Sequence, residues 1–402
     1  MSEDREDVIK VLKAAIGEHY VLTDDHSLEF YSMDVYRSFE IPIAIVQPGN
    51  IGELQETVRI ASGLGVSIVT RGGGASYTDA YLPTDPNSII IDTSRLNKIV
   101  EINEEDMFVT VEAGVTWAEM SAALAEKNLR TPFWGPFSGL KATIGGSTSQ
   151  NSVSMGSGIY GGSAESILCY EVVLANGQMI KTGSLSMENS SQFFRNYGPD
   201  LTGIFSGDAG ALGVKAKITM RLIKLPSHTL TCSFGFKNYN SMSQGMAAVA
   251  REQSISSNWG LDPKLQRGQL GKVTFMDSIR AAFAVLKTAR NPLEAIIQLI
   301  KMALAGKRFL TGFDYSAHFV AEGYSSAEVK SKLAQTRKVI SPFGTEIANT
   351  IPTVMGAMPF MPLYPILGPQ GERWVPMHGL LPFSKMQKMH DRIEELYAEK
   401  KE

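Results

Sequence analysis

Three consecutive glycines directly after a β-branched apolar stretch constrain this chain more than any other local feature. Residues 67–70, Ser-Ile-Val-Thr, are typical of a buried strand, which leads into Arg71. Gly72, Gly73 and Gly74 follow at once, with small or hydroxylated residues after them. Glycines allow a turn at positive φ and let backbone N–H groups approach a ligand, so the stretch could form an anion-binding concavity.

A plain tight turn between two strands is the alternative for this stretch when it is taken alone. It is not a Walker loop, because no Gly-Lys-Ser or Gly-Lys-Thr follows. It is also not a G-x-G-x-x-G turn that opens a helix, because residues 77–86 are poor helix formers.

Length and composition indicate a globular protein of two domains. The chain has 402 residues, more than one ordinary core accommodates, and its formal net charge is −3. It has no basic surplus that would point to nucleic acid. Cys169 and Cys232 lie in apolar contexts without a partner at ligand spacing. We therefore expect buried free thiols, a reducing compartment and no metal site.

Neither a secretory signal nor a membrane span is expected. The first ten residues are acidic and lack an apolar core, which favours a cytoplasmic protein. The most apolar long segment, residues 292–306, is shorter than the roughly 20 residues of a membrane span. It is interpreted as an amphipathic helix packed on the protein, with peripheral contact to a membrane surface as the alternative.

Strands and helices alternate around the glycine turn. Residues 43–46 predict a strand, and Asn50 with Glu53 predicts a capped helix to about Gly63. The turn then lies at the carboxyl end of the next strand, where α/β sheets bind ligands. Further strands are predicted at residues 88–92, 98–102 and 107–112. Thr116 and Glu119 predict the capped start of a second helix, and Asn176-Gly177 predicts a hairpin with a type I′ turn.

Two more glycine-rich stretches follow. The second, residues 134–162, holds eight glycines and six serines with large apolar residues between them. A flexible linker is the compositional alternative, but the apolar residues favour an ordered loop wrapped on a ligand. The third, residues 206–213, leads into an alternating strand that Pro226 ends.

The pattern changes at Pro226, so we expect one domain at residues 1–226 and a second at residues 227–402. The second part shows strand-then-helix units, which fall at residues 229–251, 309–340 and 373–400. A long helical region at residues 275–305 is inserted between the first two units.

Four short motifs in the glycine-rich stretches are more specific together than singly. They are Arg71-Gly-Gly-Gly-Ala-Ser76, Thr143-Ile-Gly-Gly-Ser147, Gly158-Ile-Tyr-Gly161 and Gly207-Asp-Ala-Gly-Ala-Leu-Gly213. Over about residues 30–226 the chain resembles the FAD-binding domain of the vanillyl-alcohol oxidase and p-cresol methylhydroxylase (PCMH) superfamily. That superfamily includes the glycolate oxidase and D-lactate dehydrogenase flavoproteins.

The resemblance implies a fold, a cofactor and a set of cofactor-binding residues. The expected fold is α+β, with a two-subdomain PCMH-type FAD-binding domain followed by a ferredoxin-like α+β cap domain. FAD is expected to bind non-covalently, because Ala75 stands where some relatives attach FAD to a histidine. The residues expected to bind it are Arg71, Gly72, Gly73, Gly74, Ala75, Ser76, Thr143, Gly145, Gly146, Ser147, Ser149, Gly158, Tyr160, Gly161, Gly213 and Val214.

The sequence departs from the superfamily pattern in three places. The usual Gly-Ser-Glu-Gly-Thr-Leu-Gly motif has lost its Glu and Thr side chains in residues 207–213, and the metal-associated His-x-Gly-Asp-Gly-Asn pattern is absent. Relatives also continue with a segment that returns to the FAD domain, so the cap is expected to be incomplete at its C-terminal end. An incomplete cap would leave a strand edge open to a second polypeptide or to a homodimer partner.

His378 and Arg373 are the catalytic candidates. Their stretch resembles the cap strand that covers the substrate side of the flavin in phenol-oxidising relatives. A histidine there could act as a base, and an arginine could bind a substrate carboxylate as a fork. His318, in a predicted strand, is interpreted as a hydrogen-bonded structural histidine.

The expected function is an FAD-dependent oxidation of a small 2-hydroxy acid, lactate or glycolate, by hydride transfer to the flavin N5. Oxidation of a para-substituted phenol is the alternative. An inactive or partial flavin-binding subunit, completed by a second polypeptide, is the alternative of another class. The sequence leaves the electron acceptor open.

Overall fold

The structure is a computed structural model that describes residues 3–34, 38–263, 282–283, 286, 296, 299–300, 312–361 and 379–400. The chain forms two compact units, with the main limit between Leu225 and Pro226. Unit 1 consists of Met1–Ser154 and Tyr160–Leu225, together with Phe360 and Met361 of the later chain. Unit 2 holds the described residues of Pro226–Pro359 and Met377–Glu402, together with Met155–Ile159 from the second glycine-rich stretch.

The first sheet of unit 1 carries the glycine turn. Its strands lie in the order β1 (Val21–Leu22), β2 (Ala44–Val46), β4 (Ser88–Asp92) and β3 (Ser67–Arg71). Since β4 is parallel to both β2 and β3, the carboxyl ends of these three strands meet at one edge. The glycines after Arg71 leave the sheet at that edge, as the sequence predicts.

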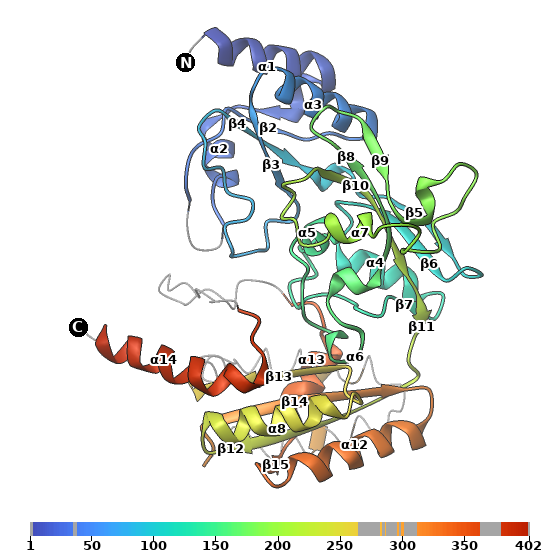
Figure 1. Cartoon of the computed structure of the whole chain (residues 1–402), viewed down its shortest axis with the longest axis vertical. Helices are drawn as coiled ribbons and strands as arrows, with labels where there is room; N and C mark the ends of the chain where they lie inside the picture. The colour runs from blue at the N-terminus through green and yellow to red at the C-terminus, as the bar shows by residue number, and fades with distance from the viewer. Residues whose placement is uncertain are drawn as a thin grey trace. The chain divides into compact units, whose positions relative to one another are not determined.

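Two helices close the first core of unit 1. Helices α1 (Glu3–Ile16) and α3 (Ile51–Gly63) run alongside each other (Figure 1). Leu12 of α1 and Leu54 of α3 are fully buried with the β-branched residues of β2 and β4. The predicted start of α3 is confirmed, because Asn50 Oδ1 accepts a hydrogen bond from the Glu53 N–H at 3.0 Å.

The second sheet of unit 1 is antiparallel and supports the second and third glycine-rich stretches. Its strands lie in the order β5 (Ile99–Asn103), β6 (Phe108–Glu112), β10 (Val214–Arg221), β8 (Ile167–Val173) and β9 (Met179–Lys181). Helices α4 (Trp117–Ala125) and α5 (Ile144–Ser149) share its core, in which Trp117, Phe133 and Tyr170 are completely buried. The predicted capping box of Thr116 and Glu119 opens α4.

The β8–β9 hairpin is confirmed, but its predicted turn type is wrong. A type I′ turn needs positive φ at both central residues, whereas here only Gly177 has a positive φ, 78°. The Gly177 N–H donates to the Leu174 carbonyl at 2.8 Å, and the Leu174 N–H donates to the Gln178 carbonyl at 2.9 Å. A type I turn closed by a left-handed glycine therefore replaces the two-residue turn that Asn-Gly usually favours.

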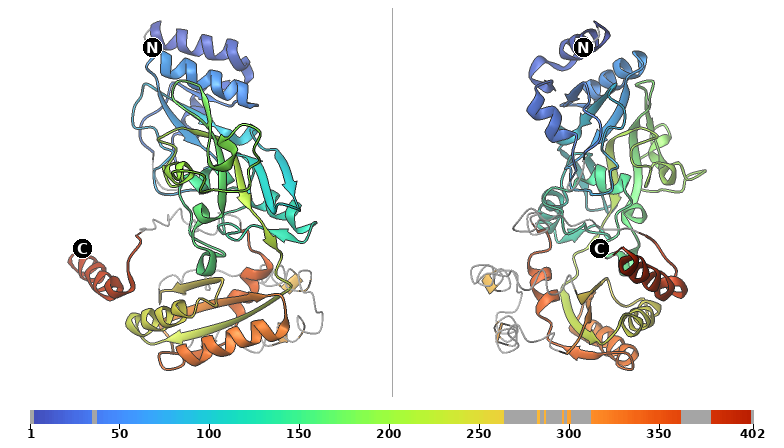
Figure 2. Two further views of the ribbon diagram at one scale, coloured as in Figure 1. Left: turned by 45° about the vertical axis from the view of Figure 1, so that its right-hand side comes forward. Right: turned by 90° about the vertical axis from the view of Figure 1, so that its left-hand side faces the viewer.

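Unit 2 is built on one antiparallel sheet. Its strands lie in the order β13 (Ser257–Leu261), β14 (Tyr315–Gly323), β12 (His228–Phe236) and β15 (Thr345–Ile347). Helices α8 (Tyr239–Arg251) and α12 (Ser326–Ile340) lie side by side on one face of it (Figure 2), where Phe234 and Phe319 close the core. Along the chain the order is β-α-β-β-α-β, which is the ferredoxin-like motif that the resemblance implies.

The described part of unit 2 corrects several expectations. Strands β13 and β15 and helix α13 (Thr350–Ala357) occur in stretches where no strand or helix was expected. The last predicted helix is present as α14 (Met386–Glu399). The four strands and two helices of the ferredoxin-like motif all lie among the described residues, so an incomplete cap is not confirmed. Residues 373–378 of the expected strand at 373–379, and most of the helical region at 275–305, lie outside the described residues.

His318 is a buried, neutral residue of β14. Its Nδ1 lies 2.9 Å from Ser233 Oγ and its Nε2 lies 3.1 Å from Ser316 Oγ, so both ring nitrogens are hydrogen bonded. Burial lowers the pKa of the imidazole to about 3, which keeps the ring uncharged. These contacts match the interpretation of His318 as a structural residue.

Candidate cofactor-binding site

The loop after β3, residues 72–76, forms a cradle of backbone donors. Within the part of the chain that the structure describes, the N–H groups of residues 73–76 find no hydrogen-bond acceptor. Gly74 has a φ of +61°, a left-handed conformation that glycine adopts without strain. A cluster of N–H groups without internal acceptors favours an anion as its ligand, because anions accept several backbone hydrogen bonds at once.

Close packing against the second glycine-rich stretch explains why the cradle is made of glycine. A Cβ on Gly73 would lie 1.6 Å from the Lys141 carbonyl oxygen, and a Cβ on Gly72 would lie 2.3 Å from Thr143 Oγ1. Gly145 is packed in the same way, because its Cβ would lie 2.8 Å from Ala113. Side chains at Gly72 or Gly73 would therefore push the two loops apart, and a side chain at Gly145 would push the start of α5 away from Ala113.

The Arg71 side chain, which directly precedes the cradle in the chain, ties it to residues 31–33. Its side chain is buried and donates to the backbone carbonyls of Tyr31 at 2.8 Å and Met33 at 3.1 Å. The guanidinium also lies over the rings of Tyr31 and Tyr81, at 5.1 and 4.6 Å from their centroids. Burial lowers the pKa of Arg71, which the nearby acidic and phenolic groups oppose. Its positive charge beside the loop adds to the attraction of an anion.

Tyr81 contacts the cradle, and the sequence did not predict this contact. Its hydroxyl donates to the carbonyl oxygens of Ser76 at 2.8 Å and Gly74 at 3.0 Å. These bonds satisfy two carbonyls of the cradle and hold the loop without using the N–H groups of residues 73–76. No periodic pattern marks Tyr81, so only the closeness of a tyrosine to the glycines could have suggested this role.

The second glycine-rich stretch packs against the cradle, but several of its own N–H groups are already hydrogen bonded within the protein. The N–H groups at the start of α5 are already used, since Ile144 donates to the Val115 carbonyl and Gly145 to the Ala113 carbonyl. Gly146 donates to Thr143 Oγ1, and Ser147 Oγ accepts from Trp117 Nε1 at 2.8 Å. Direct contact of these residues with FAD stays a prediction.

The remaining predicted cofactor residues are spread over both units. Gly158 belongs to unit 2, where its N–H donates to the Ser256 carbonyl at 2.9 Å. Tyr160 and Gly161 lie in unit 1 at the end of helix α6 (Ser157–Tyr160). The Ser149 carbonyl accepts a hydrogen bond from the Ala209 N–H, and a Cβ on Gly213 would lie 2.6 Å from Val172. Val214 is buried in the first core of unit 1, and Ala75 packs against the second core.

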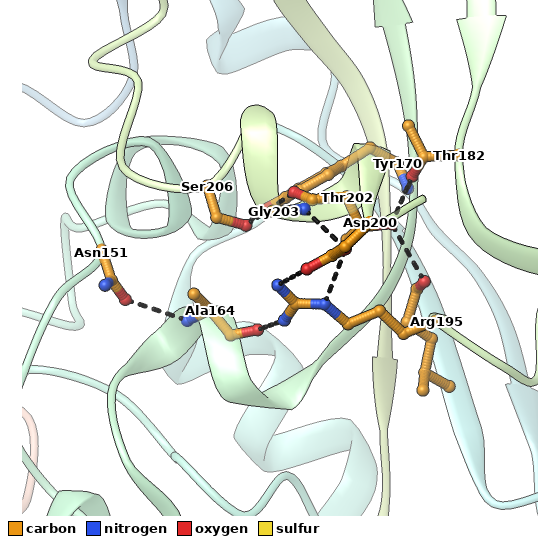
Figure 3. A network of polar contacts seen from close by, with 10 residues as sticks. Asn151, Ala164, Tyr170, Thr182, Arg195, Asp200, Thr202, Gly203 and Ser206 are labelled. Carbon is orange, nitrogen blue, oxygen red and sulfur yellow. Dashed lines mark hydrogen bonds and ion pairs between the residues drawn. The ribbon is translucent and has the colours of Figure 1, made fainter. Parts of the chain in front are cut away.

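A polar network fixes the chain that enters the third glycine-rich stretch (Figure 3). Arg195 donates to Asp200 at 2.9 and 3.1 Å and to the Ala164 carbonyl at 2.6 Å. Thr202 Oγ1 lies 2.8 Å from Thr182 Oγ1, next to β9. The Tyr170 hydroxyl lies 3.1 Å from Ser206 Oγ, and burial raises the pKa of this phenol to about 12.

A buried ion pair lies beside this network, and sequence reasoning missed it. Lys215 Nζ donates to Asp208 Oδ1 at 2.5 Å, and each side chain is only 2% exposed. Burial lowers the pKa of Lys215, while the hydrogen bond and charge of Asp208 act in the opposite direction. The visible signal was a charged residue in an alternating strand, which is usually a solvent-facing position.

The predicted catalytic residues His378 and Arg373 lie outside the described residues. Ala75, the predicted reason for non-covalent attachment, has no side-chain atom that could form a bond to a flavin. In the part of the chain that the structure describes, no group of His, Cys, Asp or Glu could hold a metal ion, and no helix is long and apolar enough to cross a membrane.

Comparisons with known proteins agree with this geometry. Residues 42–183, which include the cradle and helix α5, match the family described as FAD binding domain. The glycolate oxidase subunit GlcD of Bacillus subtilis (strain 168) is 30% identical over 226 residues, which cover 56% of this chain and 46% of that protein. The mitochondrial D-lactate dehydrogenase [cytochrome] of Arabidopsis thaliana is 30% identical over 234 residues, which cover 57% of this chain and 39% of that protein.

A solved structure shows that the fold extends over most of the chain. Substrate-bound p-cresol methylhydroxylase superposes with a TM-score of 0.70 at 19% identity, covering 88% of this chain and 69% of that chain. At this identity the likeness shows the fold alone. The sequence matches, in contrast, span less than half the length of either curated relative.

Proposed function

We propose that this chain is a PCMH-type FAD-linked flavoprotein, an FAD-dependent oxidoreductase that oxidises a small 2-hydroxy acid of the lactate or glycolate type. The observation that carries the FAD part of the proposal is the cradle, whose N–H groups at residues 73–76 have no acceptor among the described residues. The substrate class rests on the sequence matches. A pyrophosphate is the anionic part of FAD, and backbone donors can bind it without lysine or metal.

Each residue around the cradle has a distinct part in this proposal. The backbone of residues 73–76 binds the pyrophosphate, and Arg71 fixes the loop through the carbonyls of Tyr31 and Met33. Tyr81 orients the loop through the carbonyls of Gly74 and Ser76. Since Ala75 offers no attachment atom, the cofactor is held non-covalently at this loop.

Substrate oxidation needs groups beyond the cradle. Bound FAD supplies the hydride acceptor, and the protein positions the substrate and takes its hydroxyl proton. We assign the proton to His378 as general base and the substrate carboxylate to Arg373 as a bidentate partner. Both assignments rest on the sequence.

Oxidation of a para-substituted phenol is the second candidate. Its support is the shared fold with p-cresol methylhydroxylase, at 19% identity. One fold can host unrelated chemistries, whereas the hydroxy-acid proteins match in sequence at 30% identity. The 2-hydroxy acid therefore ranks first.

A flavin-binding subunit that needs a second polypeptide is the candidate of another class. One matched relative is itself named as a subunit, and the matched region spans 46% of it. Among the described strands, β13 and β15 are the outermost of the cap sheet, and edge strands in general can pair with a strand of another chain.

A substrate panel with the purified, FAD-loaded chain separates these candidates. Reduction of an artificial dye would be measured with D- and L-lactate, glycolate, longer 2-hydroxy acids and 4-alkylphenols. Turnover with a 2-hydroxy acid and none with phenols supports the first candidate, and the reverse result supports the second. Stable FAD binding with no turnover on any compound favours the subunit.

A further inference from the structure

A carboxylate is buried where the three glycine-rich stretches meet. Asp208 Oδ1 accepts from Lys215 Nζ at 2.5 Å and from the Gly210 N–H at 3.0 Å. Its other oxygen, Oδ2, is also buried and has no hydrogen-bond partner in the part of the chain that the structure describes. Leaving a buried carboxylate oxygen without a donor is unfavourable, so its presence indicates a donor that a ligand supplies.

The loop that carries Asp208 touches both of the other glycine-rich stretches. The N–H groups of Gly207 and Ala209 donate to the carbonyls of Thr148 and Ser149, at 3.0 and 2.9 Å. A Cβ on Gly210 would lie 2.3 Å from Thr70 Oγ1, in the residue before Arg71. The loop is therefore adjacent to the strand end that leads into the cradle.

The N–H groups of the residues next to Asp208 in the third glycine-rich stretch are already used within the protein. Gly207, Ala209, Gly210 and Ala211 all donate to acceptors within the protein. The Asp208 carboxylate is an acceptor in this loop, since its Oδ2 has no partner among the described residues. The chemistry of the loop thus differs from that of the cradle and fits a hydrogen-bond donor on the ligand.

We propose that Asp208 Oδ2 accepts a hydrogen bond from a hydroxyl or N–H group of bound FAD, and that Lys215 holds and neutralises this carboxylate. This inference rests on the proposed FAD site at the cradle. An ionised carboxylate only accepts hydrogen bonds, so its ligand group is a sugar hydroxyl, a ribityl hydroxyl or a ring N–H, not a phosphate. Pairing with Lys215 matters because a lone carboxylate near the cradle would repel the pyrophosphate.

Titration of the FAD-free protein with FAD tests the inference. Asp208→Asn keeps the shape of the side chain but places an NH2 donor where an acceptor is needed. We expect FAD to bind about tenfold to hundredfold more weakly, which is about 1.4 to 2.8 kcal/mol. Glu171→Gln is the matched control, because it removes the Lys217–Glu171 ion pair between the same strands, β10 and β8. Its FAD affinity should stay within twofold of the wild type.

Fragments of FAD locate the donor. If the donor is on the flavin half, Asp208→Asn weakens FMN binding and leaves ADP binding unchanged. If the donor is on the adenosine half, ADP binding weakens and FMN binding does not. Affinities for FAD, FMN and ADP that all stay within twofold in a folded variant would overturn the inference and leave the pair with a structural role.

Two further measurements keep the test decisive. The double variant Asp208→Asn/Lys215→Met has no unpaired buried charge, so it tests the same loss of affinity if Asp208→Asn alone does not fold. In the wild-type protein, FAD should slow amide hydrogen exchange in residues 206–213 as well as in residues 72–76. Slowing at residues 72–76 alone contradicts the role of Asp208 but keeps the cradle, whereas no slowing at either contradicts both.

Discussion

Gly73→Ala is the substitution that most directly perturbs the cradle. The added Cβ would lie 1.6 Å from the Lys141 carbonyl oxygen, so the two loops must move apart by about 1.8 Å to reach an ordinary contact of 3.4 Å. A shift of that size is larger than the tolerance of a hydrogen bond. We expect at least two N–H groups of residues 73–76 to lose their bonds to the pyrophosphate.

The expected loss of FAD affinity follows from the strength of those bonds. A hydrogen bond to a charged group contributes about 1.5 to 3 kcal/mol, so losing two costs about 3 to 6 kcal/mol. At 1.4 kcal/mol per tenfold change, the dissociation constant of FAD should rise by roughly 10² to 10⁴. Quenching of flavin fluorescence during titration of the FAD-free protein measures this constant.

Gly63→Ala is the matched control for this experiment. Gly63 is at the end of α3, and a Cβ there would meet nothing within 4 Å. Its FAD affinity should equal that of the wild type, and circular dichroism should show that both variants are folded. A folded Gly73→Ala protein that binds FAD within threefold of the wild type would refute the assignment of the cradle.

Three other outcomes are expected. Cys169 and Cys232 are buried, and burial raises the pKa of Cys232 to about 12. A thiol reagent should therefore label neither cysteine in the native protein and both after denaturation, and fast labelling of the native protein would contradict this. Because burial lowers the pKa of His318 to about 3, its folded form resists protonation, and its contribution to stability is lost as the pH falls from about 6.5 toward 3. In urea unfolding at pH 7 and pH 5, His318→Gln should therefore lose less stability between the two pH values than the wild type, and an equal loss would argue against a buried neutral ring. His378→Ala should lower turnover by about 10² to 10⁴ with FAD content unchanged, and an unaltered rate would remove His378 from the proposed chemistry.

Local patterns in the sequence predicted the parts of the fold that depend on neighbouring residues. The strand of residues 67–71 and the caps at Asn50 and Thr116 follow from β-branched residues, capping residues and glycine position. The β-α-β-β-α-β order of the cap was expected only from the family resemblance, because no residue pattern marked strands β13 and β15. The Asn176-Gly177 turn was misassigned because the preference of Asn-Gly for a type I′ turn is statistical, and the hairpin register decided the actual turn.

Contacts between distant residues could not be predicted in this way. Lys215 stands in an alternating strand, and only the packing of Tyr170 and Asp208 against it makes the position buried. The contacts of Arg71 with the Tyr31 and Met33 carbonyls cross about 40 residues of chain, so no local pattern could show them, and direct contact of Arg71 with FAD stays a prediction. The second glycine-rich stretch resembled a donor loop, whereas tertiary acceptors already occupy the N–H groups of Ile144 and Gly145.

The flavin content of the purified protein tests the central claim most directly. The protein would be precipitated with acid, the flavin in the supernatant identified by chromatography, and the pellet examined for fluorescence on a denaturing gel. The account predicts one FAD per chain in the supernatant and no fluorescence on the polypeptide, because the backbone of residues 73–76 binds the pyrophosphate and Ala75 forms no bond to flavin. Failure of the FAD-free chain to bind FAD, or a flavin that stays on the denatured polypeptide, would contradict it.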